Sequence, residues 1–243
     1  MKQNIYDNDT FFEKYSQMRR SVQGLEGAGE WKTLEAMLPD FQGKRVLDLG
    51  CGYGWHCQYA IEHGAKSVIG VDLSDRMLAV AREKTAKNIQ YICQPIEDAE
   101  FPDNAFEVVV SSLAFHYLES FDDIAAKVSK WLTDHGDFVF SVEHPIFTAQ
   151  GTQDWYRDAD GNILHFPVDN YFYEGQREAN FLGETVIKYH KTITTYLNAL
   201  LKNGFTITGL VEPQPNQEML NTIEGMKNEL RRPMMLLISA RKN

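Results

Sequence analysis

The 243-residue sequence has little cysteine, no long apolar run and no excess of basic charge. Its three cysteines, Cys51, Cys57 and Cys93, are odd in number and lack a second cluster, which argues against a disulfide framework and against a zinc site. We therefore expect reduced thiols, a cytoplasmic location and no metal.

The lack of a long apolar run and the lack of excess basic charge limit the possible partners. No run approaches the roughly 18 apolar residues that span a bilayer, and the polar first residues lack the apolar core of a signal peptide. The net charge of −10 opposes binding to a phosphate backbone or to anionic lipid, although it leaves room for a local basic patch. We therefore expect neither nucleic acid nor a membrane as a partner.

What the sequence does contain is an alternation of strand and helix patterns. Apolar runs predict seven strands, at residues 45–49, 67–72, 88–93, 106–111, 137–142, 205–211 and 234–238. Helices are predicted in two segments within 9–38 broken around 24–29, over 55–63, after Ser74, and over 190–202. A further helix is predicted from the spacing of Ile124, Val128, Trp131 and Leu132, ending near Gly136. This order implies a Rossmann-like, doubly wound α/β fold with a mostly parallel seven-stranded sheet and helices on both faces.

We expect one domain over residues 1–243. Its parts are N-terminal helices (1–40), a binding core (44–143), an inserted cap after the fifth strand (144–187) and a C-terminal helix with strands (188–243). The cap is inferred because the alternation fails there, and loops on a rigid sheet often carry specificity. Its aromatic residues either cover a substrate or belong to the core; they are Trp155, Tyr156, Phe166, Tyr171, Phe172 and Tyr173.

A glycine-rich turn, DLGCGYG at residues 48–54, joins the first strand to its helix. Alternating glycines let a ligand lie against bare main chain, and the helix N-terminus adds a positive dipole. Asp72 ends the second strand, where an acid reaches the ribose of an adenosine-containing ligand. The alternative is that the glycines only shape a turn and Asp72 caps a helix, but the order of strand, turn, helix, strand and acid favours binding.

The spacing of the glycines separates two classes of enzyme. A nicotinamide-dependent oxidoreductase needs Gly-x-Gly-x-x-Gly, and this chain has Trp55 at the third glycine position. That enzyme class is therefore disfavoured.

Residues 141–145 and 232–238 resemble bacterial methyltransferases that act on small molecules. Four segments within residues 44–143 resemble the class I S-adenosylmethionine-dependent methyltransferases as a whole. They are residues 46–54, 70–74, 101–106 and 111–118. The resemblance implies S-adenosyl-L-methionine as cofactor, S-adenosyl-L-homocysteine as product, and transfer of a methyl group to a small-molecule acceptor by in-line displacement. The oligomeric state, monomer or homodimer, stays open.

The resemblance also implies roles for individual residues. It places Gly50, Gly52 and Gly54 against the methionine moiety, Asp48 in the turn, Asp72 on the ribose, Leu73 and Met77 on adenine, the Ile96 N–H at the adenine ring, and Ser111 and Leu113 in the segment that closes the methionine end. Relatives usually have Asp where this chain has Pro95, so Glu97 or Asp98 is the candidate for the adenine amine. Tyr15 and Arg19 resemble an N-terminal pattern in which the arginine pairs with the cofactor carboxylate.

Methyl transfer needs alignment first, because the sulfonium is a good leaving group. A general base is needed only if the acceptor arrives protonated. Candidate bases are His116, Glu143, His144, His165 and His190. His116 and His144 are expected to be catalytic because they follow strands at the carboxyl edge of the sheet, and the alternative for each is a hydrogen-bonded structural histidine.

Two further functions compete with this one. A non-catalytic module that binds S-adenosylmethionine would have the same cofactor motifs. A nucleic-acid amino-methyltransferase would carry an Asn/Asp-Pro-Pro-aromatic stretch after the fourth strand, where this chain has SSLA at residues 111–114.

Overall fold

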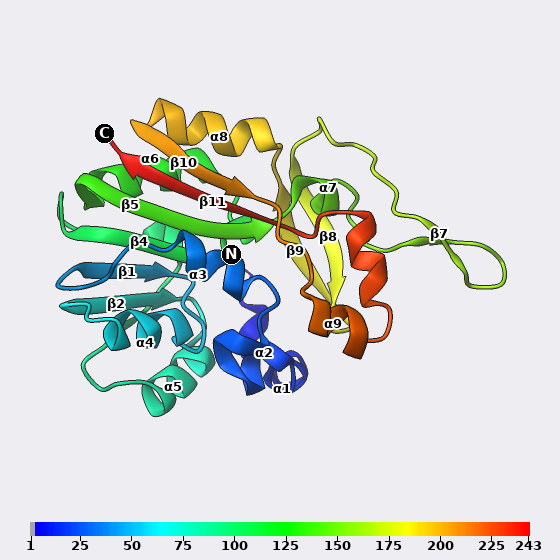
Figure 1. Cartoon of the computed structure of the whole chain (residues 1–243), viewed down its shortest axis with the longest axis horizontal. Coiled ribbons are helices and arrows are strands. Elements are labelled where there is room, and N and C mark those ends of the chain that lie inside the picture. Colours follow the sequence, from blue (N-terminus) through cyan, green and yellow to red (C-terminus); the bar gives the residue numbers. More distant parts are fainter. Residues whose placement is uncertain (1–2) are drawn as a thin grey trace.

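The central element is a seven-stranded sheet with the order β10-β11-β5-β4-β1-β2-β3, seen in a computed structural model that describes residues 3–243 (Figure 1). Its strands are β1 (Arg45–Leu49), β2 (Ser67–Asp72), β3 (Gln90–Cys93), β4 (Phe106–Ser112), β5 (Leu132–Glu143), β10 (Phe205–Val211) and β11 (Met235–Lys242). Strand β11 is antiparallel to both its neighbours and the other pairs are parallel. The mostly parallel seven-stranded sheet predicted from the sequence is thereby confirmed.

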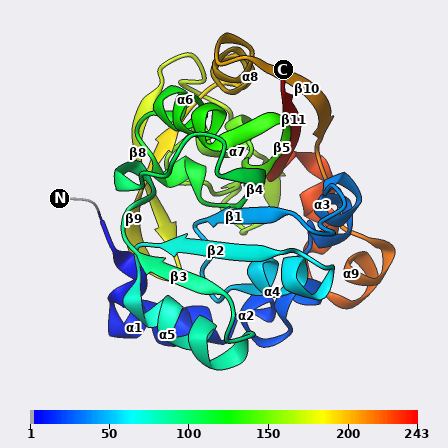
Figure 2. The ribbon, with the colours of Figure 1, turned by 90° about the vertical axis from the view of Figure 1, so that its left-hand side faces the viewer.

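Helices cover both faces of the sheet (Figure 2). They are α1 (Asp9–Ser16), α2 (Arg19–Val22), α3 (Trp31–Met37), α4 (Trp55–Glu62), α5 (Asp75–Lys84), α6 (Phe121–Trp131), α7 (Pro145–Thr148), α8 (Ile193–Lys202) and α9 (Gln217–Thr222). Short 3-10 helices occupy Ile5–Asp7, Gly24–Gly27, Ile96–Asp98, Phe115–Tyr117 and Met226–Arg231.

Alternate residues of the central strands supply the two cores. On β1, Leu47 and Leu49 belong to the core under α6 and α8, whereas Val46 packs in the opposite core with Cys57 of α4 and Leu78 of α5. Side chains along a strand point to opposite faces in turn, so a short apolar run fills both layers. This burial fixes the sheet as a rigid platform for the loops at its carboxyl edge.

Several predicted boundaries were wrong. Helix α6 ends at Trp131, not near Gly136, because Leu132 is already extended and pairs with Phe106 as the first residue of β5. The N-terminal region contains three short helices where two segments were expected, although the 3-10 helix Gly24–Gly27 lies at the predicted break. Strand β11 extends to Lys242.

Residues 144–187 contain two hairpins. The outer hairpin, β6 (Tyr156–Arg157) with β7 (Ile163–His165), projects from one end of the molecule (Figure 1). The inner hairpin, β8 (Gly175–Phe181) with β9 (Glu184–His190), lies at the end of the sheet and continues past residue 187, so α8 begins only at Ile193. The division of the chain into a core and a cap stays a prediction.

No helix within residues 3–243 is long and apolar enough to cross a membrane.

Candidate functional site

The glycine turn after β1 places bare main chain at the carboxyl edge of the sheet. Gly50 has φ of 77° and Gly52 has φ of 52°, values that side-chain-bearing residues rarely adopt. A Cβ atom on Gly50 would lie 2.4 Å from the Cβ of Ala114. The turn is held by Val71, whose carbonyl accepts the Gly50 N–H at 2.8 Å.

Asp72 ties this turn to the end of β2. Its Oδ2 accepts the Gly52 N–H at 2.8 Å, and its Oδ1 accepts the Ser74 N–H at 2.9 Å. Burial raises the pKa of Asp72, while the two backbone donors oppose that rise. These two hydrogen bonds hold the carboxylate in a fixed orientation at the end of β2.

A cavity of about 600 Å³ opens between this edge and the inner hairpin. Ten of the residues predicted for the site line it: Tyr15, Gly50, Gly52, Asp72, Leu73, Met77, Ile96, Glu97, Leu113 and His116. The carboxyl edge of parallel strands is the usual place for ligands in this architecture. The cavity joins residues from five different strand-end loops and from the first helical segments.

Arg19 is not among the lining residues. Helix α1 ends at Ser16, Met18 is extended, and α2 begins at Arg19, whose side chain is exposed. Because the helix is broken at this point, Arg20 and not Arg19 lines the cavity. The Arg20 guanidinium pairs with Glu30 at 2.9 Å.

Asp48 and Ser111 lie beneath the cavity floor. Oδ2 of Asp48 accepts a hydrogen bond from the Cys57 thiol at 3.3 Å, and burial raises the pKa of Asp48 to about 7. The Ser111 hydroxyl donates to the Leu49 carbonyl at 2.7 Å. Asp48 thus contacts α4, and Ser111 joins β4 to β1; neither residue lines the cavity.

Gly54 is the N-cap of α4, with φ of 73°. A Cβ there would lie 2.1 Å from Oη of Tyr91, so the glycine is required by packing behind the turn. It does not line the cavity.

The remaining histidine candidates lie elsewhere. His144 is buried as the N-cap of α7, with Nδ1 accepting the Ile146 N–H at 3.0 Å and Nε2 at 2.8 Å from a carboxylate oxygen of Glu212. His190 is buried against the Thr148 hydroxyl at 2.8 Å, and His165 is exposed on the outer hairpin. All three are absent from the cavity lining in the described chain.

His116 and Glu143 are the two candidate bases that do line the cavity. The Glu143 N–H donates to Nδ1 of His116 at 3.3 Å, and burial lowers the pKa of His116 to about 4. A neutral imidazole that accepts at Nδ1 carries its proton on Nε2. His116 can therefore donate a hydrogen bond into the site, but its basic nitrogen is occupied.

Whereas the His116 imidazole is neutral, the Glu143 carboxylate is ionised. Burial works against its ionisation, but the neighbouring His116, Lys188 and Gln153 outweigh burial and lower the pKa of Glu143. The Lys188 ammonium donates to Oε1 at 2.6 Å, and the Gln153 amide donates to Oε2 at 2.7 Å. Glu143 is thus an ionised, oriented hydrogen-bond acceptor.

Sequence reasoning missed Asn4 as a lining residue. Its amide donates to the Leu73 carbonyl at 3.3 Å, while its Oδ1 is buried with no hydrogen-bond partner in residues 3–243. Nothing in the polar N-terminal pattern distinguishes Asn4 from its neighbours. Within and just beyond the expected cap, the residues that line the cavity come from the inner hairpin; they are Gln176, Phe181, Val186, Ile187 and Tyr189. The six aromatic residues named from the sequence are not among the lining residues of this cavity in the described chain.

In the described part of the chain, no cluster of three or more His, Cys, Asp or Glu residues could hold a metal ion.

Comparisons with known proteins identify the family. Residues 47–140 match the methyltransferase domain family. A protein from Listeria monocytogenes that is assigned to the S-adenosylmethionine-dependent methyltransferases is 57% identical, with a TM-score of 0.86 over 90% of this chain and 99% of that one. The chain belongs to the S-adenosylmethionine-dependent methyltransferases. A further family member, from Mesorhizobium loti, is 43% identical, with a TM-score of 0.83 over 90% of this chain and 100% of its own.

One relative is similar over the full length. This methyltransferase is 36% identical to a Haemophilus influenzae protein of uncharacterised function, over 99% of this chain and 98% of that protein.

The geometry of the methyltransferase fits its cofactor, S-adenosylmethionine. The tight turn at Gly50 and Gly52 leaves main chain open to the cavity, and the Asp72 carboxylate lies at the end of the neighbouring strand. The buried Oδ1 of Asn4 offers an acceptor for a ligand donor.

Proposed function

We propose that this methyltransferase methylates a small-molecule acceptor bound between His116, Glu143 and the inner hairpin. The observation that carries the proposal is one cavity of about 600 Å³ with the glycine turn and Asp72 at one part of its lining and the Glu143 carboxylate at another. A cavity of this size is typical of small-molecule sites, and the inner hairpin forms part of its lining.

The acceptor chemistry follows from the two polar groups. When bound, S-adenosylmethionine supplies an electrophilic methyl group. Glu143 accepts the hydrogen bond of a protonated nucleophile and takes its proton as the nucleophile attacks, and Nε2–H of His116 donates to a second polar atom. Lys188 keeps the carboxylate ionised. The acceptor is thus expected to carry a hydroxyl, thiol or amine.

We further propose which residues hold the cofactor. Asp72 binds the ribose diol, Gly50 and Gly52 contact the methionine part, and Asn4 Oδ1 accepts the adenine amine in place of the carboxylate missing at Pro95. Leu73, Met77 and Ile96 line the adenine end, and Arg20 takes the role expected of Arg19.

The role of Asn4 is testable with a base analogue. The Asn4→Ala variant should bind S-adenosylhomocysteine more weakly than wild type, yet bind S-inosylhomocysteine, which lacks the amine, with unchanged affinity. Equal losses for both ligands in calorimetry would remove Asn4 from the adenine site.

The function is tested by methyl transfer from labelled cofactor to small-molecule, peptide and RNA acceptors. We expect label on a hydroxyl, thiol or amine compound, and a loss of about 10²–10⁴ in rate for Glu143→Gln. The control is Glu178→Gln, an exposed carboxylate on the inner hairpin, which should match wild type. Transfer only to peptide or RNA would contradict the proposal.

The cytoplasmic location and the monomeric or homodimeric state expected from the sequence stay predictions.

A further inference from the structure

A second cavity, of about 450 Å³, lies next to the first. Its walls come from the outer hairpin, residues 213–215, α9 and the 3-10 helix Met226–Arg231 (Figure 1). The side chains that line it are predominantly apolar and include Trp155, Ile163, Pro213, Met219 and Met226. The resemblance to the family assigns no role to this space.

Two methionines form a shared wall, because Met234 and Met235 line both cavities. Met235 pairs with Glu143 across β11 and β5, so this wall stands directly beside the proposed reacting end of the first cavity. Methionine side chains are unbranched and adaptable, which makes such a wall easy to displace.

An ion pair also connects the two spaces. Arg20 lines the first cavity and Glu30 lines the second, and their charged groups are 2.9 Å apart. This independent contact places the two cavities on opposite sides of one thin partition.

The charged groups around the second cavity are largely paired. Glu30 pairs with Arg20 at 2.9 Å and Glu229 pairs with Arg232 at 2.7 Å, which leaves Glu224 and Arg157 as the other charged lining residues. The lining therefore offers no excess of positive charge to a carboxylate or phosphate. An uncharged apolar group would instead replace water on apolar side chains.

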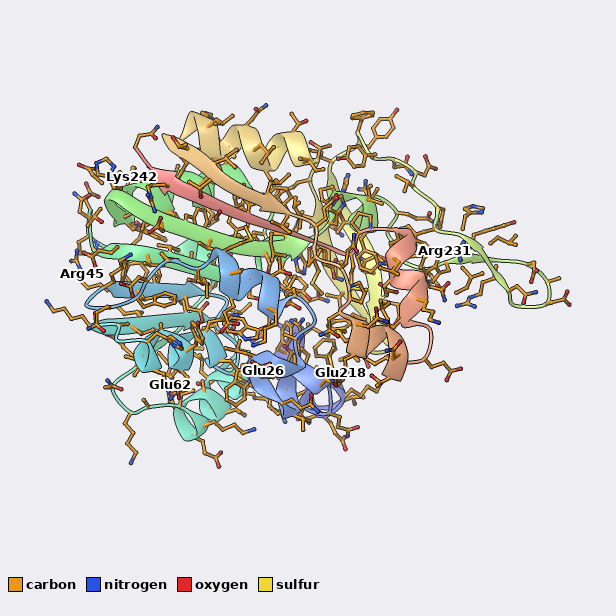
Figure 3. The ribbon with its side chains drawn as sticks, viewed as in Figure 1. Glu26, Arg45, Glu62, Glu218, Arg231 and Lys242 are labelled. Atoms are coloured by element: carbon orange, nitrogen blue, oxygen red, sulfur yellow. The ribbon has the colours of Figure 1, made fainter. Side chains whose placement is uncertain are left out.

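The outer hairpin that covers this cavity is held in place by the chain itself. Arg231 donates to the Leu164 carbonyl at 2.6 Å, and its guanidinium lies 5.1 Å from the centre of the Trp155 ring. Figure 3 shows Arg231 at the end of the molecule from which the hairpin projects. The cavity is therefore a built space between ordered elements.

We propose that the second cavity binds the uncharged, apolar tail of the methyl acceptor while the nucleophile of the same molecule lies at Glu143. This inference rests on the proposed small-molecule function. The acceptor is then an elongated amphipathic compound whose tail passes Met234 and Met235.

The test measures binding to the complex with S-adenosylhomocysteine, so it does not require turnover. The probes are 4-alkylphenols with tails from methyl to heptyl. Once the tail passes the methionine wall, each added methylene should tighten binding about fourfold. Replacing the tail end by a carboxylate should abolish that gain.

Two variants are designed to fill the second cavity, and a third variant serves as a control. Met219 lines the cavity close to Gly29, where a Cβ atom would lie 3.0 Å from its Cε, so Met219→Trp should fill the space. Met226→Trp is a second choice if the first does not fold. Both should leave 4-methylphenol binding unchanged and remove the gain from longer tails. Leu230→Trp, at an exposed side chain on the same 3-10 helix, should match wild type.

The outcomes separate this inference from the proposed function. Affinity that does not grow with tail length, or grows equally in the filled variants, overturns the second cavity as a tail site. Methylation of peptide or RNA alone in the acceptor screen would overturn the proposed function itself. A crystal structure with the 4-heptylphenol tail outside the second cavity would also overturn the inference.

Discussion

The Asp72 carboxylate holds the glycine turn and also faces the cavity. Replacing it by alanine removes the acceptor for Gly52 and the proposed ribose contact together. We expect Asp72→Ala to weaken S-adenosylhomocysteine binding by about 1.5–3 kcal/mol, the usual range for hydrogen bonds to a charged group. Calorimetry measures this change. Asp75→Ala, three residues away and exposed on α5, is the control and should bind as wild type.

His116 gives the protein a defined response to acid. Its pKa in the folded protein is about 4, below the ordinary value of 6.5, so between these two pH values the unfolded chain binds a proton that the folded chain does not. Stability should therefore fall as the pH decreases from 6.5 to 4, with a contribution from this group of up to about 3 kcal/mol.

The variant His116→Asn should lack this part of the pH dependence, since an amide oxygen can still accept the Glu143 N–H without titrating. Urea unfolding at several pH values between 4 and 7 measures it. His165→Asn, at an exposed position, is the control and should follow the wild-type curve. An unchanged slope in His116→Asn would contradict the assignment.

Among the individual residues of the site, the sequence could predict some and not others. The Gly50–Gly52 turn and Asp72 were predictable because their chemistry is local: a left-handed turn and an acid at a strand end. Arg20 was not, because the choice between Arg19 and Arg20 depends on the one extended residue, Met18, that separates α1 from α2. A four-residue spacing assumes a continuous helix, and the sequence gives no sign of this break.

At the scale of elements, the two hairpins should have separate effects. Tyr156 and His165 are direct partners, so an Asn-Gly turn can replace residues 157–164. In the described chain none of the deleted residues lines the first cavity, whereas Arg157 and Ile163 line the second.

This deletion should leave S-adenosylhomocysteine affinity unchanged and reduce the binding of 4-hexylphenol towards that of 4-methylphenol. Calorimetry on the purified variant measures both. The comparison variant is Phe181→Ala in the inner hairpin, which opens the first cavity and should weaken both phenols equally. A deletion variant that binds both phenols as wild type does would show that the outer hairpin has no part in ligand binding.

The elements of the sheet were predictable because they alternate and are buried on both faces, but their ends were not. The start of β5 at Leu132 depends on its pairing with Phe106 in another strand. The inner hairpin was hidden for a similar reason. Its strand β9 alternates between buried positions such as Val186 and outward ones, but the aromatic and polar residues around it obscured that pattern.

At the scale of the whole molecule, cofactor product should stabilise the fold. S-adenosylhomocysteine at about 100 times its Kd adds about 2.7 kcal/mol, which for a chain of this size raises Tm by roughly 5–11 °C. Differential scanning fluorimetry with increasing ligand measures the shift. NAD⁺ at the same concentration is the control and should give none. A flat response to S-adenosylhomocysteine would count against the cavity as the cofactor site.

The methionines give the molecule a built-in set of spectroscopic probes. The sequence has eight, and six of them, Met18, Met77, Met219, Met226, Met234 and Met235, line one or both cavities. Each carries a methyl group whose carbon-13 resonance depends on the aromatic rings and ligands around it. Selective labelling would therefore report occupancy of the two cavities separately, in solution. The same placement exposes both sites to a common hazard, since oxidation of these sulfurs would put a polar sulfoxide in an apolar wall.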